Sequence, residues 1–212
     1  MIALVIGATG ATGKDLVQQL IKDAYFTEIR LFVRRAVPYE HPKVKIVIVD
    51  FDQLEDFSEE ISGDVLFSCL GTTLKQAGSK ENQWEIDFDI PYVFSKIAKR
   101  NKVPTCVLVS SYGASPDSYV FYSRMKGTLE EAVEILNFNH LVIFKPGSLI
   151  REGTDRLGEK ISIKLLRCLN TLGLLRKFRP LSTAVLAQKL VKASKQVQQR
   201  KEIIELDRIF TY

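Results

Sequence analysis

Short apolar runs alternate with longer amphipathic stretches along the first 150 residues of the chain. The apolar runs predict buried strands over residues 2–6, 28–33, 44–49, 64–68, 103–110 and 140–145. The amphipathic stretches predict helices over residues 14–21, 81–101 and 118–136, and Pro91 is expected to kink or break the long one. Strands that alternate with helices favour an α/β fold, in which a doubly wound, mostly parallel sheet carries helices on both faces.

The C-terminal part follows a different pattern. Leucine and isoleucine are interleaved with lysine and arginine over residues 160–179, which predicts a basic amphipathic helix. A further helix is expected over residues 181–193 and a short strand over 202–206. We expect one domain over residues 1–212, with a core at 1–150 and a small C-terminal helical extension at 151–212. The extension would cover the substrate pocket as a lid, or alternatively bind a protein partner.

Composition narrows the class of protein. A hydrophobic content of 46% is enough for a sizeable core, and the absence of a run of about 20 apolar residues predicts no membrane span. Residues 151–212 hold 14 basic and 6 acidic side chains, and the whole chain has a net charge of +5. The simplest interpretation of this basic third is a solvated surface. The chain carries no motif of a nucleic-acid-binding module, so we expect no nucleic-acid partner.

Cysteine and histidine usage predicts a reducing compartment and no metal site. Cys69, Cys106 and Cys168 are widely spaced, and neither His41 nor His140 has a cysteine or histidine at ligand spacing. The N-terminal apolar run is too short for a signal peptide. We therefore expect reduced thiols and a cytoplasmic location.

Three glycines follow the first predicted strand at the spacing G-x-x-G-x-x-G. Gly7, Gly10 and Gly13 stand between an apolar run and an amphipathic helix. Glycines let the backbone turn tightly and approach phosphates, and a helix N-terminus offers unpaired amides and a positive dipole end. This arrangement predicts a site for a nucleotide pyrophosphate, although the standard fingerprint is G-x-G-x-x-G.

Two arginines follow the second predicted strand. In an NAD-binding unit, an acidic residue about 20 residues past the glycines bonds the ribose hydroxyls. Arg34 and Arg35 occupy that place, and no Asp or Glu occurs between Arg30 and Val37. A guanidinium can pair bidentately with a 2′-phosphate that a carboxylate would repel. The sequence therefore predicts NADP(H) in preference to NAD(H).

A tyrosine and a lysine are spaced for proton transfer on the helix predicted over residues 118–136. Tyr122 and Lys126 share a helix face, so the ammonium would favour proton loss from the phenol. Ser110 and Ser111 follow the preceding strand, and a hydroxyl there could bond the substrate oxygen that Tyr122 protonates. Because parallel strands end at one edge of a sheet, these serines, the glycines, the arginine pair and residues 69–72 should converge.

These residues resemble the short-chain dehydrogenase/reductase superfamily, and more narrowly its atypical NADP-binding Rossmann-fold members of the Tat-interacting protein group. The matching segments are GATGATGKDLV, LFVRR, VDFDQLEDF, CLGTT, VSSYGAS, FYSRMKGTLEE and FKPGSLI. The resemblance implies cofactor contacts from Gly7, Thr9, Gly10, Ala11, Thr12, Gly13, Arg34, Arg35, Asp50, Phe51, Leu70, Gly71, Thr72, Lys126, Pro146 and Gly147. It implies a catalytic set of Tyr122, Lys126 and either Ser110 or Ser111.

The function expected from this sequence is an NADP(H)-dependent oxidoreductase that transfers hydride to or from a small carbonyl or alcohol. One alternative is a redox sensor or scaffold that binds NADPH without turnover and binds a protein partner through its basic C-terminal segment. An NAD-dependent epimerase or dehydratase is a third interpretation. A second copy of the chain is a further candidate partner. The sequence does not identify the substrate.

Overall fold

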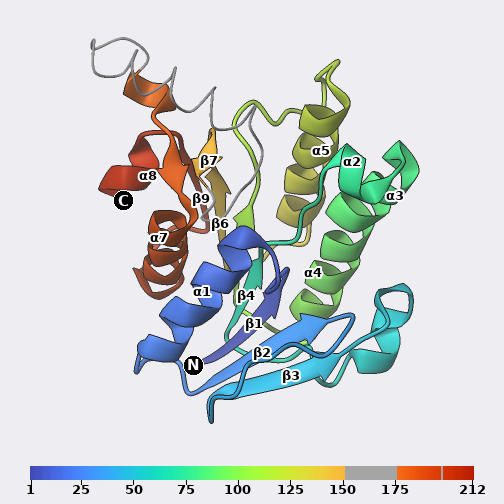
Figure 1. Ribbon diagram of the computed structural model, residues 1–212, viewed down its shortest axis with the longest axis vertical. Helices are drawn as coiled ribbons and strands as arrows, with labels where there is room; N and C mark the ends of the chain where they lie inside the picture. The colour runs from blue at the N-terminus through green and yellow to red at the C-terminus, as the bar shows by residue number, and fades with distance from the viewer. Residues whose placement is uncertain (151–175, 197) are drawn as a thin grey trace.

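Seven parallel strands form the central sheet, in the order β3-β2-β1-β4-β5-β6-β9 (Figure 1). The computed structural model describes residues 1–150, 176–196 and 198–212. The strands of the sheet are β1 (Ile2–Ile6), β2 (Glu28–Val33), β3 (Val44–Ile48), β4 (Val65–Ser68), β5 (Thr105–Val109), β6 (His140–Lys145) and β9 (Lys201–Glu205). A separate parallel pair joins β7 (Leu149–Ile150) to β8 (Leu181–Ser182).

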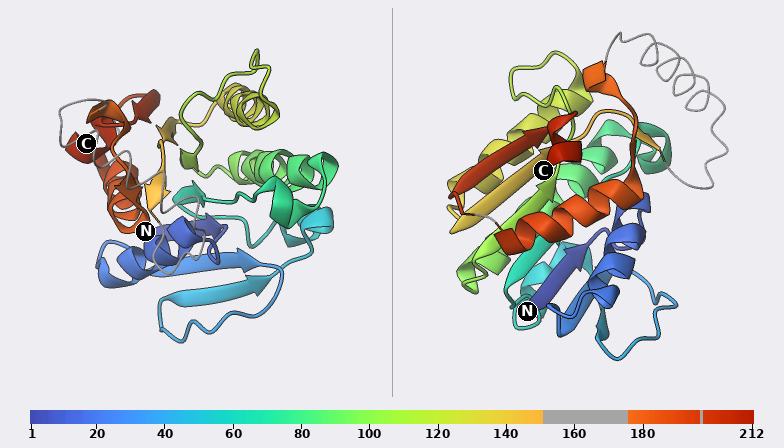
Figure 2. Two further views of the ribbon diagram at one scale, coloured as in Figure 1. Left: turned by 45° about the horizontal axis from the view of Figure 1, so that its top comes forward. Right: turned by 90° about the vertical axis from the view of Figure 1, so that its left-hand side faces the viewer.

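Helices cover both faces of the sheet. They are α1 (Ala11–Lys22), α2 (Leu74–Ala77), α3 (Lys80–Trp84), α4 (Ile90–Arg100), α5 (Phe121–Ile135), α7 (Thr183–Gln196) and α8 (Arg208–Thr211). Short 3-10 turns occupy Phe51–Phe57 and Arg176–Phe178. Helices α1 and α7 lie side by side on one face, and α4 and α5 lie on the other (Figures 1 and 2).

The side chains of the inner strands alternate between two cores, as the period of two requires. On β1, Ala3 and Val5 pack in the cluster shared with α1 and α7, whereas Leu4 and Ile6 pack toward α4 and α5. Burial on both faces explains why the strands appear as continuous apolar runs in the sequence. The doubly wound α/β fold predicted from the sequence is confirmed.

The strand order reverses direction at β1, which has β2 on one side and β4 on the other. In an open α/β sheet, ligands bind outside the carboxyl ends of the strands at such a switch point. All the sequence clusters singled out above follow strand ends at this edge, because every described strand pair of the sheet is parallel.

The long helix predicted over residues 81–101 is interrupted by a π-helical turn at Glu85–Asp89, so it consists of α3, that turn and α4. Pro91 is buried in the first turn of α4. Its nitrogen carries no hydrogen and cannot donate to the carbonyl of Asp87, four residues earlier, which favours the wider turn. The break expected at Pro91 therefore takes the form of a bulge that precedes it.

The C-terminal residues that the structure describes complete the core. Strand β9 pairs with β6, and α7 contributes Leu186, Ala187 and Leu190 to the cluster beneath α1. The helix expected over residues 181–193 begins two residues later and ends three residues later than predicted. Most of the basic helix and lid expected over residues 160–179 lies outside the described residues. Within the described parts of the chain, none of the helices has the length and apolar composition needed to span a membrane.

Candidate nucleotide and substrate site

At two glycines of the turn after β1, neighbouring backbone atoms leave no room for a side chain. Gly7 has a positive φ of 82°, and a Cβ there would lie 2.5 Å from the backbone of Cys69. A Cβ at Gly13 would lie 2.0 Å from the carbonyl oxygen of Gly7. These two glycines bring α1 against the sheet beside the end of β4, which is the geometry that a pyrophosphate-binding turn needs.

Gly10 is exposed and stands at the N-cap of α1. A Cβ at this position would meet only the carbonyl oxygen of Gly7, at 3.3 Å, so the side facing the helix N-terminus is open. The first amides of α1 have no helical acceptor, and no side chain caps them at Gly10. Thr9 is exposed beside them, whereas Thr12 is buried. The open amides fit a phosphate group.

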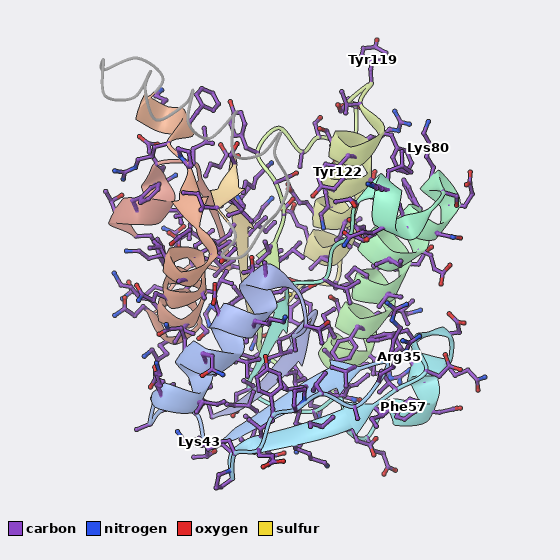
Figure 3. All side chains as sticks on the ribbon, viewed as in Figure 1. Arg35, Lys43, Phe57, Lys80, Tyr119 and Tyr122 are labelled. Carbon is purple, nitrogen blue, oxygen red and sulfur yellow. The ribbon has the colours of Figure 1, made fainter. Side chains whose placement is uncertain are left out.

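The ends of β2 and β3 place a second polar cluster next to the glycine turn. Arg34 and Arg35 directly follow β2, and both are exposed; Figure 3 labels Arg35 beyond that strand end. Asp50 is exposed after β3, where its carboxylate accepts a 3.0 Å hydrogen bond from the amide of Asp52. Phe51 is half-buried beside it. These four residues could hold the adenosine half of a dinucleotide.

The loop after β4 is fastened by two residues that the sequence analysis missed. Asp87, in the π-helical turn, is completely buried and accepts a 2.7 Å hydrogen bond from the amide of Thr72. The side-chain amide of Gln83 donates to the carbonyl of Thr72 at 3.4 Å. Leu70 and Gly71 are thereby held at the strand edge. No sequence pattern indicated these residues, because their role depends on the bulge in the helix.

A pocket of about 320 Å³ lies between the segments that follow β5 and β6, the start of α5 and the turn at Arg176–Phe178. Its described lining residues are Ser111, Tyr112, Tyr122, Pro146, Gly147, Ser148 and Phe178. Four of these had been selected from the sequence as catalytic or cofactor-binding residues. The pocket lies at the strand edge where the dinucleotide elements converge, and Figure 3 shows Tyr122 near the start of α5.

The two adjacent serines have different surroundings. Cys106 and Leu108 face α4 and α5, and the alternation of β5 turns Ser110 the same way, where its hydroxyl donates to the carboxylate of Glu130. Ser111 turns the other way and lines the pocket. Its buried hydroxyl has no hydrogen-bond partner among the described residues. Strand alternation was a signal in the sequence that could have separated them.

Glu130 belongs to a buried charge network behind the pocket. Its second carboxylate oxygen pairs with the ammonium of Lys145 at 3.1 Å. Lys145 also donates to the carbonyl of Ala114 at 3.1 Å and lies 3.6 Å from Glu205. The network ties the ends of β5, β6 and β9 to α5, and Lys145 directly precedes Pro146 in the pocket wall.

Lys126 is buried one helical turn from Tyr122. Burial raises the pKa of Asp87 above its ordinary value, and the positive charge of Lys126 acts in the opposite direction. Burial likewise raises the pKa of Cys69 to about 12 against the influence of Lys126. The ammonium therefore lies near the loop after β4, on the side where a nicotinamide ribose is expected.

A second, wider hollow of about 540 Å³ lies along α3 and the start of α5. Its lining includes Lys80, Trp84, Asp89 and Phe121. None of the residues selected from the sequence lines it, so the smaller pocket at the strand edge is the candidate active site.

Known proteins share sequence and fold with this chain. A family model described as NAD(P)H-binding matches residues 7–141. "Protein FMP52, mitochondrial" of Candida glabrata is 34% identical over 169 residues, which cover 78% of this chain and 72% of that protein. "Protein HTATIP2" of Rattus norvegicus is 33% identical over 165 residues, which cover 76% of this chain and 68% of that protein.

Solved structures share the fold at low sequence identity. A short-chain dehydrogenase/reductase superfamily protein from Agrobacterium tumefaciens with bound NAD superposes with a TM-score of 0.72 and 13% identity, covering 97% of this chain and 77% of that one. UDP-glucose 4-epimerase from Thermotoga maritima with UDP-glucose gives a TM-score of 0.72 and 12% identity. The superposition covers 100% of this chain and 81% of that one.

The cytoplasmic location expected from the sequence is wrong on this comparison. Five relatives of this chain carry the name "Protein FMP52, mitochondrial". The expectation rested on cysteine usage and on the short N-terminal apolar run, and neither distinguishes the cytosol from other reducing compartments.

Proposed function

Because the chain belongs to the NAD(P)H-binding family, among the atypical Rossmann-fold members of the short-chain dehydrogenase/reductase superfamily, we propose that it is an NADP(H)-dependent oxidoreductase. Its substrate would be a small carbonyl compound or the corresponding alcohol. The observation that carries this proposal is the pocket shared by Ser111, Tyr122, Pro146 and Gly147 at the sheet edge that also carries the glycine turn.

NADPH bound in this site would supply the hydride that converts the substrate carbonyl into an alcohol. Tyr122 gives its phenolic proton to the substrate oxygen and regains a proton from solvent, to which 38% of its surface is exposed. Ser111 would donate a hydrogen bond to the same oxygen, since this residue lines the pocket and its buried hydroxyl has no other partner among the described residues. Lys126, one helical turn from Tyr122, would bond the nicotinamide ribose.

Ser110 is not proposed as the substrate-binding hydroxyl. Its hydroxyl donates to Glu130, and the residue is buried on the α5 side of the sheet. We assign it a supporting role, in which it fixes the end of β5 so that Ser111 projects into the pocket.

The preference for NADP(H) rests on Arg34 and Arg35. Both guanidinium groups are exposed at the end of β2. A 2′-phosphate carries two negative charges near neutral pH, and a guanidinium fork pairs with it better than any neutral group. Replacing both arginines by alanine should therefore weaken NADPH binding while leaving NADH binding nearly unchanged.

The first experiment is a fluorescence titration of the purified chain with NADPH and, in parallel, NADH. We expect NADPH to bind at least about tenfold more tightly, since one charge-assisted pair contributes about 1.5–3 kcal/mol. Turnover is then measured with a panel of carbonyl compounds for the wild type and for Tyr122→Phe. The variant should bind NADPH normally and lose turnover. Equal affinity for the two cofactors would refute the arginine assignment, and full turnover by the variant would refute the role of Tyr122.

A further inference from the structure

The substrate pocket has aromatic walls. Tyr112 and Phe178 are far apart in the sequence, yet their ring centroids lie 5.5 Å apart and the ring planes meet at 80°. Both rings line the pocket, together with Tyr122 and Pro146. An edge-to-face pair presents a ring face and a ring edge to the cavity, and both favour contact with a third flat ring.

The position of Tyr112 is fixed by the backbone. Its amide donates a 2.9 Å hydrogen bond to the carbonyl of Pro146, which joins the segment after β5 to the segment after β6. Gly113 follows with a positive φ of 76°, so the chain turns sharply after Tyr112. The ring of Tyr112 is thus attached at the pocket rim by the same two segments that carry Ser111 and Gly147.

The polar groups of the described lining are neutral hydroxyls. Ser111 and Tyr122 can bind one substrate oxygen between them, and Ser148 adds a third hydroxyl. No side chain in this described lining carries a charge. A carboxylate or phosphate placed here would lose hydration without gaining a charged partner from these residues, which costs free energy.

Two of the described cations near the pocket, Lys145 and Arg179, are engaged in other contacts. Lys145 is occupied by Glu130, Glu205 and the carbonyl of Ala114. The guanidinium of Arg179 lies 3.5 Å from the ring centroid of Phe210, away from the lining. These contacts leave the hydroxyls as the polar recognition elements among the described lining residues.

We infer that the pocket selects a neutral carbonyl compound with a flat aromatic group, whose ring packs against Tyr112 and Phe178 while its oxygen meets Ser111 and Tyr122. This inference rests on the proposed function, and it adds the class of substrate. A sugar nucleotide or a keto acid would not satisfy this lining, because both carry negative charge.

Binding of unreactive amides tests the inference independently of turnover. Dissociation constants are measured by saturation-transfer NMR on the full chain with NADP⁺ for benzamide, for benzoate and for cyclohexanecarboxamide. Benzamide should bind roughly tenfold more tightly than benzoate, its anionic counterpart, and more tightly than the saturated ring. Benzoate binding as tightly as benzamide would overturn the inference.

Variants locate the binding site. Tyr112→Ala and Phe178→Ala should each weaken benzamide binding roughly 5- to 10-fold, while affinity for NADPH stays unchanged. Tyr119→Ala is the matched control, because Tyr119 is fully exposed at the tip of the same loop and outside the described lining (Figure 3). Unchanged benzamide binding in both pocket variants would overturn the inference.

The two proposals can fail separately. If the wild type does not bind NADPH, the proposed function fails, and the same amide titrations without cofactor still test the pocket. If NADPH binds and carbonyl compounds are reduced but benzoate competes better than benzamide, the substrate class is wrong and the oxidoreductase proposal stands.

Discussion

The amide of Thr72 donates a 2.7 Å hydrogen bond to the buried carboxylate of Asp87. The other carboxylate oxygen of Asp87 has no partner among the described residues and lies 3.8 Å from the place a Cβ would take at Gly71. A carboxylate in the π-helical turn thus anchors the loop that is expected to line the nicotinamide ribose.

The first prediction concerns this anchor. Asp87→Asn keeps an oxygen that can accept from Thr72, so NADPH affinity should stay within about threefold of the wild type. Asp87→Ala leaves the Thr72 amide without its acceptor, at a cost of about 1–3 kcal/mol, and should weaken NADPH binding about tenfold or more. Fluorescence titration of both variants measures this, and equal affinities for NADPH in the two variants would argue against the anchor.

Because of Asp87, we also expect the stability of the folded protein to depend on pH. Burial raises the pKa of Asp87 above its ordinary value of 3.8, with Lys126 and the Thr72 amide opposing the shift. The native state therefore holds the proton more tightly than the unfolded chain. The contribution of Asp87 to stability is fully present below that ordinary value and is lost as the pH rises through the folded-state pKa. Asn does not titrate, so the stability of Asp87→Asn relative to the wild type should increase between about pH 4 and pH 7, measured by urea unfolding. A relative stability that does not change with pH would contradict the assignment.

We expect alanine at Ser110 and alanine at Ser111 to cause two different defects. Ser111→Ala should fold and bind NADPH normally but lose most of its turnover, because the hydroxyl proposed to hold the substrate oxygen is gone. Ser110→Ala leaves an oxygen of Glu130 without its donor, so we expect about 1–3 kcal/mol of destabilisation by urea unfolding. If Ser110→Ala abolished turnover at unchanged stability while Ser111→Ala did not, the assignment of the two serines would be reversed.

The fold was predictable, and the residues proposed to bind the dinucleotide could be assigned to one edge of the sheet, because these signals are local. Apolar runs, the glycine turn and Arg34-Arg35 are all continuous in the sequence, and a parallel sheet brings their ends to one edge. Boundaries shifted by a few residues at several elements, for example at β5, which covers Thr105–Val109 within the predicted 103–110.

The supporting residues were not predictable in the same way. Glu130 and Lys145 are separated by 15 residues, and their ion pair exists only because α5 packs against the end of β6. Asp87 appeared in the sequence as one acidic position on a long helix, and the π-helical turn placed it in the interior. Such contacts arise from tertiary packing and from a local change in helix geometry, neither of which has a period in the sequence.

We expect Cys69 and Cys106 to resist thiol reagents in the folded protein. Burial raises the pKa of Cys69 and of Cys106 to about 12, so both remain neutral thiols near neutral pH. Because the thiolate is the reactive species, a Cys168→Ser variant should show little labelling by a maleimide near pH 7.5 until it is unfolded. Labelling in denaturant supplies the control, since both thiols then become accessible. Rapid labelling of the native variant would contradict the raised pKa of these two thiols.

Two glycines of the same turn should respond differently to alanine. At Gly13 the added Cβ would lie 2.0 Å from the carbonyl oxygen of Gly7, a backbone atom that cannot rotate away. Gly13→Ala should therefore destabilise the fold by about 3 kcal/mol or more. At Gly10 the corresponding contact is 3.3 Å and the φ of −72° suits alanine, so Gly10→Ala should unfold close to the wild-type denaturant midpoint.

The affinity of these two variants for NADPH then tests where the pyrophosphate binds. The methyl group of Gly10→Ala would stand beside the open amides of α1, where the backbone has to approach phosphate oxygens closely. We expect a folded protein with NADPH affinity reduced about tenfold or more in a fluorescence titration. Wild-type affinity in folded Gly10→Ala would mean that the phosphates do not contact this helix end, whereas a loss of affinity without a loss of stability separates the binding role of Gly10 from the packing role of Gly13.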